Sequence, residues 1–226
     1  MEKKLKISII GGTGKEGRGL AYRWLKAGYP VKIGSRKKEK ALQAVDELLK
    51  ILGNEYQDLL AGDLNEKAVA GCDVAVLTIP YEFHAEMLTS MKPYLKGKYL
   101  LDVTVPLVPP KVSVVRIPEK GSAALEAQSI LGENVKVISA FQNISFELLL
   151  SNKNIECDVF VCGLDKESRS IGLTLVKDAG LRGWDAGPLE NSIISEGLTS
   201  ILIRINKQFG LHNTGVRITG VNRENH

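Results

Sequence analysis

Two hydrophobic patterns alternate along the chain. Short, nearly continuous apolar runs are typical of buried β-strands, whereas apolar residues three or four positions apart are typical of helices. Because the two patterns alternate, we expect an α/β fold built on a parallel, doubly wound sheet. The strand patterns cover residues 7–10, 29–34, 59–62, 71–80, 97–103 and 135–138. The helix patterns cover residues 20–25, 41–52, 66–70, 81–91 and 121–131.

The alternation continues after a loop at residues 139–144, where we place a change of domain. We therefore expect a larger domain over residues 1–142 and a smaller C-terminal α/β domain over residues 143–226. The expected later elements are strands at residues 158–163 and 181–187 and helices at residues 167–179 and 191–210. The last helix has one apolar stripe, which could face the core or a partner subunit. Its members are Ile194, Leu198, Ile201, Leu202 and Ile205.

The first apolar run ends in a glycine triplet, Gly12-x-Gly14-x-x-Gly17, and a helix pattern follows it. This order matches the dinucleotide fingerprint of Rossmann-type domains. The first glycine serves the turn, the second lets a pyrophosphate approach the backbone, and the third lets the helix lie close to the strand. A glycine-rich turn of another α/β protein is the competing interpretation. A Walker loop does not fit, because Glu16 follows Lys15.

The end of the second strand indicates which dinucleotide binds. An NAD site has an acidic residue there to hold the ribose 2′-hydroxyl, whereas this chain has Ser35 and Arg36, with Lys40 one helical turn further. A hydroxyl and cations suit the 2′-phosphate of NADP. Cations at a helix start are otherwise unfavourable because of the helix macrodipole. We therefore expect an NADP-binding Rossmann domain over residues 1–142.

Composition narrows the class of protein. Hydrophobic residues make up 44% of the 226, and the net charge is only +4, with no basic stripe that would favour nucleic acid. Three cysteines are too few for a disulfide framework. No residues stand at metal-ligand spacing. The start of the chain leads directly into the first strand, without a signal peptide or membrane span. We therefore expect a cytoplasmic protein without metal, membrane or nucleic-acid partners.

Loops that follow the other strands are further candidates, because ligands bind such sheets at the carboxyl ends of the strands. Ile79 and Pro80 are candidates for the walls around the adenosine and the nicotinamide ribose, and Val108 for a place nearer the nicotinamide. Ordinary core packing is an equally good interpretation of these apolar residues.

Several motifs together resemble the NADP reductases that depend on coenzyme F420, a deazaflavin, and the resemblance covers nearly the whole chain. The motifs are Gly11-Gly12-Thr13-Gly14-x-x-Gly17, Gly34-Ser35-Arg36, residues 75–80, Pro106-Leu107-Val108-Pro109, Val161-Cys162-Gly163 and Asp185-Ala186-Gly187-Pro188-Leu189-x-Asn191-Ser192. The resemblance implies hydride transfer between NADP(H) and coenzyme F420, in a cleft closed by the C-terminal domain, and a homodimer. It implies that the NADP phosphates contact Thr13, Gly14, Lys15, Glu16, Ser35, Arg36 and Lys40, with Ile79 and Val108 near the cofactor. Gly12, the first glycine of the triplet, is a further cofactor-binding candidate.

Three positions differ from that family and concern the side of the cleft expected to face the deazaflavin. Gln142 stands where a histidine is common, Ile193 where an arginine is frequent, and Gly197 where a serine is frequent. Hydride transfer between two cofactors needs little acid–base chemistry, so we assign no catalytic acid or base. Gln142, Asn143 and Thr199 could bind a ring edge or could cap turns and helices. An NADPH reductase for a flavin or small carbonyl compound, and a non-catalytic NADP sensor, are the alternatives.

Overall fold

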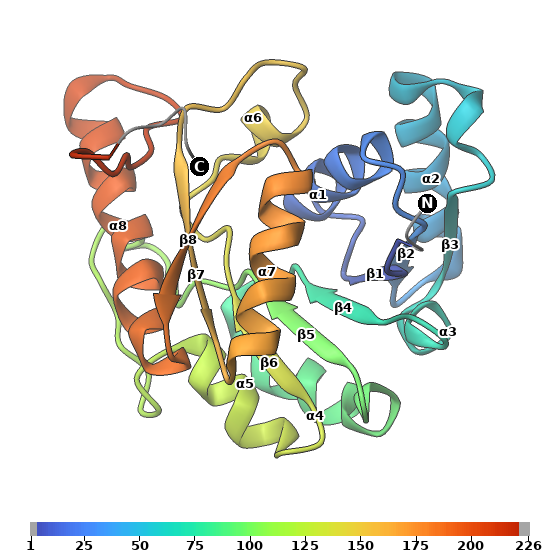
Figure 1. The fold of residues 1–226 in the computed structure, drawn as a ribbon, viewed down its shortest axis with the longest axis horizontal. Helices are drawn as coiled ribbons and strands as arrows, with labels where there is room; N and C mark the ends of the chain where they lie inside the picture. The colour runs from blue at the N-terminus through green and yellow to red at the C-terminus, as the bar shows by residue number, and fades with distance from the viewer. Residues whose placement is uncertain (1–3, 222–226) are drawn as a thin grey trace.

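The computed structural model describes residues 4–221; residues 1–3 and 222–226, with His226 among them, lie outside the described part of the chain. One eight-stranded sheet forms its centre, in the order β3-β2-β1-β4-β5-β6-β7-β8 (Figure 1). The strands are β1 (Ile7–Ile10), β2 (Val31–Ser35), β3 (Leu60–Leu64), β4 (Val74–Leu77), β5 (Tyr99–Asp102), β6 (Lys136–Ser139), β7 (Asp158–Gly163) and β8 (Arg182–Gly187).

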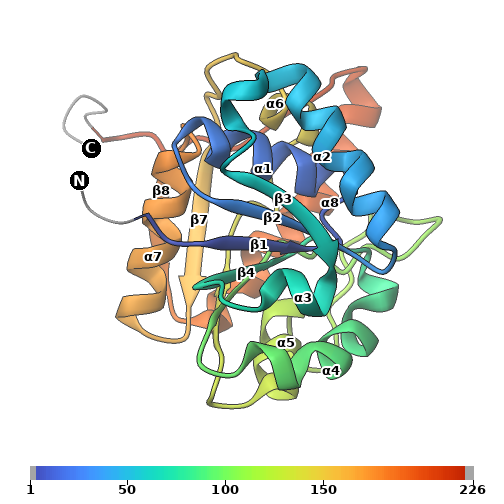
Figure 2. The ribbon, with the colours of Figure 1, turned by 90° about the vertical axis from the view of Figure 1, so that its right-hand side faces the viewer.

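Helices cover both faces of this sheet. Figure 2 shows α1 and α2 on one face and α3, α4 and α5 on the other. Helix α7 packs beside α1, and α8 packs beside α5. The helices are α1 (Lys15–Lys26), α2 (Lys38–Leu52), α3 (Asn65–Val69), α4 (His84–Leu95), α5 (Ala123–Leu131), α6 (Phe146–Leu149), α7 (Lys166–Asp178) and α8 (Ser192–Phe209). Short 3-10 turns are η1 (Asn54–Tyr56), η2 (Tyr81–Phe83) and η3 (Leu189–Asn191).

The expected strands and helices are confirmed in kind and order, and most differ from expectation only by a few residues at their ends. Helix α6 was not expected, because four residues are too few to display a helical period. The parallel sheet expected over the first six strands is confirmed, because β1 to β6 are all parallel. Strand β7, for which the sequence predicted no direction, joins the same sheet and runs antiparallel to β6.

The reversal at β7 follows from the connection that precedes it. After β6 the chain stays at the carboxyl edge of the sheet, with only the short α6 in between, and enters β7 from that edge. A parallel strand would need a crossover that returns the chain to the opposite edge, usually through a helix along one face. Strand β8, which follows the full helix α7, is parallel to β7 as that rule requires.

Two apolar clusters hold the layers together, one on each face of the sheet. On the α1 face the fully buried Trp24 donates its indole N–H to the backbone oxygen of Leu175 in α7, at 2.9 Å. The same indole meets the ring of Phe141 edge-on, with the centroids 5.8 Å apart. One side chain of α1 therefore contacts both α7 and the loop after β6, and burying an aromatic ring of this size is worth several kcal/mol.

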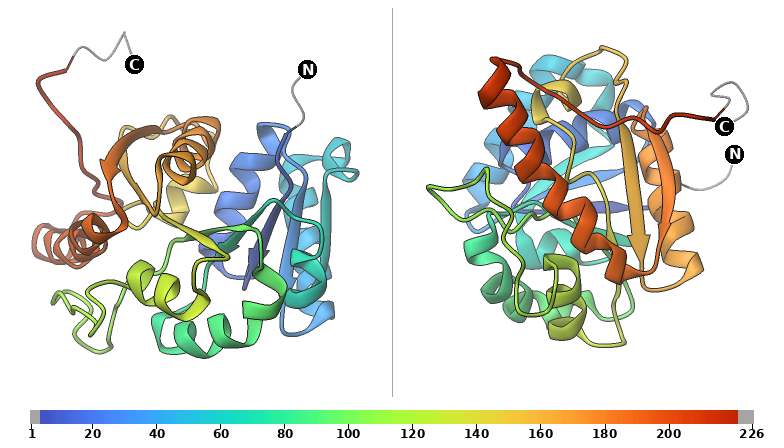
Figure 3. Two further views of the ribbon diagram at one scale, coloured as in Figure 1. Left: turned by 60° about the horizontal axis from the view of Figure 1, so that its bottom comes forward. Right: turned by 90° about the vertical axis from the view of Figure 1, so that its left-hand side faces the viewer.

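The division into two domains near residue 142 stays a prediction. The position lies in the loop after β6, but sheet pairing crosses it, because Ile138 pairs with Gly163. Figure 3 shows α8 on the outside of the molecule, with residues 103–122 looping beside it. Within residues 4–221, none of the helices has the length and apolar character that spanning a membrane requires.

Candidate functional site

The glycine turn after β1 brings α1 into close contact with the sheet. Gly11 has a φ of +70°, a conformation that side chains disfavour. A Cβ added to Gly17 would lie 2.7 Å from the Cα of Gly12, so only glycine permits this approach of helix to strand. At Gly14 the nearest atom to an added Cβ is 3.7 Å away, and the residue is exposed. The backbone at Gly14 is therefore open to a ligand.

The N-terminus of α1 has no side-chain cap. Gly14 is its N-cap residue and makes no side-chain hydrogen bond, so the first N–H groups of the helix remain available. Gly14, Lys15 and Glu16 line a cleft at the same edge of the sheet. An uncapped helix N-terminus that faces a cleft favours an anion, both through its N–H groups and through the helix dipole.

This cleft lies along the carboxyl ends of the parallel strands and has a volume of about 770 Å³, within the range of small-molecule sites. One wall comes from α1 and from the residues after β4 and β5, including Ile79, Tyr81 and Thr104. The other wall comes from the loop after β6 and from α8, including Gln142 and Thr199. The two predicted domains therefore both contribute to one cleft.

The predicted 2′-phosphate site lies at the adjacent strand β2. Ser35 is buried at the end of β2, and its Oγ accepts the backbone N–H of Lys37 at 3.2 Å. Arg36 and Lys40 are exposed and form no ion pair within residues 4–221. The guanidinium of Arg36 lies 5.8 Å from the ring centroid of Phe83 in η2. Because η2 also supplies Tyr81 to the cleft, the basic residues stand next to the cleft rather than in its lining.

The remaining predicted residues differ in whether they line the cleft. Ile79 lines it, as do Lys15 and Glu16, whereas Gly12 and Thr13 lie in the turn behind its wall. Val108 is not part of the lining and is 44% exposed, although its neighbours Leu107 and Pro109 both line the cleft. The role assigned to Val108 is the least supported of these by the geometry, and all of the roles remain proposals.

The carboxyl group of Glu16 lies where a negative charge is unfavourable. Its Oε1 is buried and has no hydrogen-bond partner within residues 4–221. Burial raises the pKa of this carboxyl to about 8, because a charged carboxylate loses its hydration there. At neutral pH the neutral acid therefore predominates, and it can donate one hydrogen bond into the cleft beside the N-terminus of α1.

The loop after β6 holds Gln142 against the end of β5. Phe141 has a φ of +72°, which is rare outside glycine. The Nε2 group of Gln142 donates to the backbone oxygen of Asp102 at 3.0 Å and to Ser139 Oγ at 2.8 Å. Its backbone oxygen accepts the Thr199 hydroxyl of α8 at 2.8 Å. Both amide hydrogens of Gln142 are therefore used inside the protein, which leaves only Oε1 for a ligand.

Of the three positions that differ from the family pattern, Gln142 alone lines the cleft. The side chain of Ile193 packs near Gly121, and an added Cβ at Gly197 would lie 3.3 Å from Val115. Both positions therefore face the long loop after β5. Asn143, the other candidate of this loop, donates to the backbone oxygen of Asp158 at 2.8 Å, which is a structural contact.

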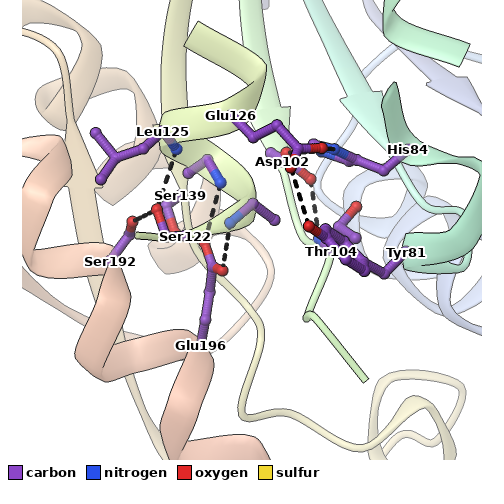
Figure 4. Close-up of polar contacts among 12 residues, drawn as sticks. Tyr81, His84, Asp102, Thr104, Ser122, Leu125, Glu126, Ser139, Ser192 and Glu196 are labelled. Atoms are coloured by element: carbon purple, nitrogen blue, oxygen red, sulfur yellow. Dashed lines mark hydrogen bonds and ion pairs between the residues drawn. The ribbon is translucent and has the colours of Figure 1, made fainter. Parts of the chain in front are cut away.

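A cluster of ionisable side chains, centred on the buried His84 and Asp102, adjoins the cleft residues Tyr81 and Thr104 (Figure 4). His84, fully buried in α4, contacts Asp102 Oδ2 through Nε2 at 2.7 Å and Glu126 Oε1 through Nδ1 at 3.0 Å. Tyr81 donates its hydroxyl to the second oxygen of Glu126 at 2.9 Å. Burial lowers the pKa of His84, but the two carboxylates more than offset this and raise it to about 9. The imidazole is therefore protonated at neutral pH.

Asp102 and Glu196 connect this group to the cleft wall and to α8. The Oδ1 of Asp102 accepts the backbone N–H of Thr104 at 2.9 Å. Glu196, on α8, accepts the N–H groups of Ala123 and Ala124 at the start of α5, at 2.7 and 3.1 Å. Burial raises the pKa of Glu196 to about 8, although these N–H groups oppose the shift. Helix α8 is thus fixed to the core through the helix that also supplies Glu126.

Sequence analysis did not identify the buried group. His84 and Asp102 are 18 positions apart, and His84 and Glu126 are 42 apart, on three different elements. The one usable signal was Asp102 itself, a carboxylate at the end of an apolar strand run, where a charge needs a partner.

Comparisons with known proteins agree with this geometry. The family model described as "NADP oxidoreductase coenzyme F420-dependent" matches residues 6–106. An F420-dependent NADP reductase of Methanocaldococcus jannaschii is 39% identical, over 96% of this chain and 99% of the relative. The chain belongs to the F420-dependent NADP reductase family. The enzyme of that name from Methanothermobacter thermautotrophicus is 38% identical, over 96% of each chain.

A solved structure shows the same fold. It is a candidate F420-dependent NADP reductase from an Arthrobacter species, with a TM-score of 0.79 and 24% identity, covering 95% of this chain and 99% of the other. The Rossmann-type α/β fold expected from the sequence is therefore confirmed, and the observed sheet is parallel except at β7.

The buried carboxyl of Glu16 gives a testable effect on stability. Because its pKa in the folded protein, about 8, exceeds the ordinary 4.5, the folded state retains a proton that the unfolded chain has lost, and stability falls as pH rises through that interval. Glu16→Gln should remove this loss. The gain in the free energy of unfolding over the unaltered protein should grow between about pH 5 and about pH 8 by at least ~1.4 kcal/mol, the equivalent of one pKa unit.

Urea unfolding at several pH values measures this gain. Glu39→Gln is the matched control, because Glu39 stands in the first turn of α2 but is exposed. The growth of the gain with pH should be larger for Glu16→Gln than for this control, because the Glu16 carboxyl loses its hydration on folding. Equal growth for the two variants would contradict the raised pKa.

Proposed function

We propose that this protein transfers a hydride between NADP(H) and a deazaflavin, coenzyme F420. One observation carries the proposal: an uncapped helix N-terminus and two walls of mixed apolar and polar residues converge on one cleft of about 770 Å³ at the carboxyl edge of the sheet. The names of the relatives support the choice of substrates. No catalytic acid or base is assigned, because the bound nicotinamide and deazaflavin supply the hydride chemistry when both are present.

The order of the strands supports one direction for a bound NADP molecule. The basic residues stand at the end of β2, the open helix N-terminus follows β1, and Ile79 and Thr104 follow β4 and β5. In the sheet these strands are neighbours in the order β2-β1-β4-β5. Three strand spacings amount to about 14 Å, a length that suits an extended dinucleotide. The 2′-phosphate would therefore lie at β2, the pyrophosphate at β1 and the nicotinamide near β4 and β5.

The residues at the phosphate positions fit NADP. Arg36 and Lys40 are cations without an ion-pair partner in the described structure, and Ser35 places a hydroxyl beside them. Gly14 leaves the backbone open at the helix N-terminus. Arg36 can bind a phosphate through two parallel hydrogen bonds, and the neutral form of Glu16 can lie near the phosphates without repelling them.

The wall formed by the β6 loop and α8 would hold the acceptor ring. Phe141, Leu202 and Ile203 are apolar residues of this wall, and Gln142 and Thr199 are polar residues next to them. A flat ring with polar edges suits such a mixture. These side chains would align the two rings and exclude water, which is the contribution that hydride transfer between cofactors needs from a protein.

Oxidation of NADPH by purified protein tests the proposed reaction. With coenzyme F420 as acceptor, the absorbance of NADPH and that of the oxidised deazaflavin should fall together, with one equivalent of each consumed. Turnover with FMN but none with F420 would favour a flavin reductase on the same scaffold. Tight NADPH binding without turnover on any of these acceptors would favour a sensor. Either result would refute the proposed substrate.

Arg36→Ala tests the cofactor assignment separately. Loss of a charged hydrogen bond should weaken NADP binding by about 1.5–3 kcal/mol, while NAD binding should stay nearly unchanged because NAD has no 2′-phosphate. Lys50→Ala is the matched control, because Lys50 is an exposed cation in the last turn of α2, at the other end of the helix. Calorimetric titration of each variant with both nucleotides gives the four affinities. Equal losses for NADP and NAD would contradict the assignment.

We also propose that the protein is a homodimer and is cytoplasmic. Ile194 of α8 is 76% exposed and Ile117 of the neighbouring loop is 66% exposed; large apolar residues gathered on one face favour a partner. The three cysteines are buried and free, as suits a reducing compartment.

Sedimentation velocity tests the dimer. Ile194→Lys should convert a dimer to the 24.7 kDa monomer, because a buried charge at an interface is unfavourable. Ile51→Lys is the control, since Ile51 is 60% exposed on α2, away from α8. A monomeric unaltered protein would refute the dimer.

Fractionation of cells that produce the protein tests the proposed cytoplasmic location.

A further inference from the structure

Thr104 carries a buried hydroxyl that the protein itself leaves without a partner. The residue is 4% exposed and lines the cleft, and its Oγ1 has no hydrogen-bond partner within residues 4–221. A buried polar atom without a partner costs about 1–3 kcal/mol. A ligand in the cleft that offered a complementary group would remove this penalty.

The place of Thr104 along the cleft indicates which part of the ligand it meets. Thr104 follows β5, at the opposite end of the strand series from the basic residues after β2. If NADP lies along β2-β1-β4-β5, as proposed above, the nicotinamide end of the molecule reaches Thr104. The polar group on that ring is the carboxamide.

The buried group behind Thr104 fixes its position. Asp102 Oδ1 holds the backbone N–H of Thr104 at 2.9 Å, and His84 holds the other oxygen of Asp102 at 2.7 Å. Figure 4 shows Asp102 between Thr104 and the pair formed by His84 and Glu126. His84 uses its second nitrogen on Glu126, so the whole chain of contacts is anchored in α5. The backbone of Thr104 is therefore held in place at the wall of the cleft.

The charges around Thr104 select one end of a carboxamide. Asp102, which holds the backbone N–H of Thr104, belongs to a cluster with His84, Tyr81 on η2, Glu126 on α5 and Glu196 on α8. In this cluster three carboxyl groups stand beside one cation, His84. Lys15 is a further cation of the cleft lining, but it follows β1 rather than β5. More carboxyl groups than cations next to Thr104 favour a hydrogen-bond donor from the ligand. The carboxamide NH₂ is a donor, whereas its oxygen is an acceptor.

We propose that Thr104 Oγ1 accepts a hydrogen bond from the carboxamide NH₂ of the nicotinamide, and that Asp102 and His84 are positioning residues that hold Thr104 for this contact. The inference rests on the proposed NADP site and adds a specificity-determining residue to it. Its consequence is a fixed rotation of the nicotinamide ring, so that one face is directed toward the acceptor wall of Gln142 and Thr199.

The 3-acetylpyridine analogue of NADP tests the contact, because it replaces the carboxamide NH₂ by a methyl group and keeps the rest of the molecule. The unaltered protein should bind NADP about tenfold or more tighter than the analogue, since the analogue leaves Oγ1 unpaired. Thr104→Val should reduce this ratio to about one, and Thr104→Ser, which keeps the hydroxyl, should retain it. Thr89→Val is the matched control: Thr89 is exposed on α4, outside the cleft lining, and should keep the full ratio.

His84→Gln tests the positioning role. If His84 acts through Asp102 on Thr104, the variant should weaken NADP about fivefold or more and leave the affinity for the analogue unchanged. A purely structural role would weaken both ligands alike. Because removing one member of a buried charged group can unfold a protein, Thr104→Val and Thr104→Ser, which leave that group intact, decide the inference if His84→Gln does not fold.

The outcomes separate this inference from the function on which it rests. Normal NADP binding with the same preference over the analogue in the unaltered protein and in Thr104→Val would overturn the role of Thr104 and leave the reductase proposal standing. Failure of the unaltered protein to bind NADP would overturn both. The inference is supported if the ratio of the affinities for NADP and for the analogue depends on the Thr104 hydroxyl.

Discussion

Contact between the start of α1 and the end of β1 determines where the other parts of the site lie. Gly17 approaches Gly12 so closely that a methyl group would not fit between them. The approach directs the uncapped N-terminus of α1 at the carboxyl edge of the sheet, where Gly14, Lys15 and Glu16 enter the cleft. The anion-binding end of the helix, the basic residues after β2 and the loops after β4 and β5 are thereby brought to one edge.

The second half of the cleft depends on a different kind of interaction. Helix α8 carries Glu196, whose carboxyl binds the first N–H groups of α5, and Thr199, whose hydroxyl binds the loop after β6. These polar contacts fix the distance between the two walls more specifically than an apolar face would. A buried group of this kind adds little net stability, because desolvation offsets the attraction between charges. Its contribution is to the geometry of the cleft.

The sequence was sufficient for features that a short stretch of chain specifies. The glycine turn, the strand that precedes it and the basic residues after β2 are each local, and the structure has them at neighbouring strands as expected. The antiparallel strand β7 was not predictable from hydrophobic periodicity, because a buried strand looks the same in either direction. The contact of His84 with Asp102 and Glu126 joins three elements, and local patterns do not contain information about such pairs. Glu16 was predicted as a phosphate contact, but only the structure showed that one oxygen of its carboxyl, Oε1, is buried without a partner among the described residues.

The central claim is that the cations after β2 surround the 2′-phosphate of NADP, and phosphorus NMR tests it most directly. The 2′-phosphate of free NADP gains a proton near its second pKa of about 6, and its resonance moves accordingly. If Ser35, Arg36 and Lys40 surround this group, the bound phosphate should stay a dianion and its resonance should stay in place from about pH 8 down to about pH 5. A bound 2′-phosphate that titrates like the free one would contradict the account, since it would show that this group lies in solvent away from the cations.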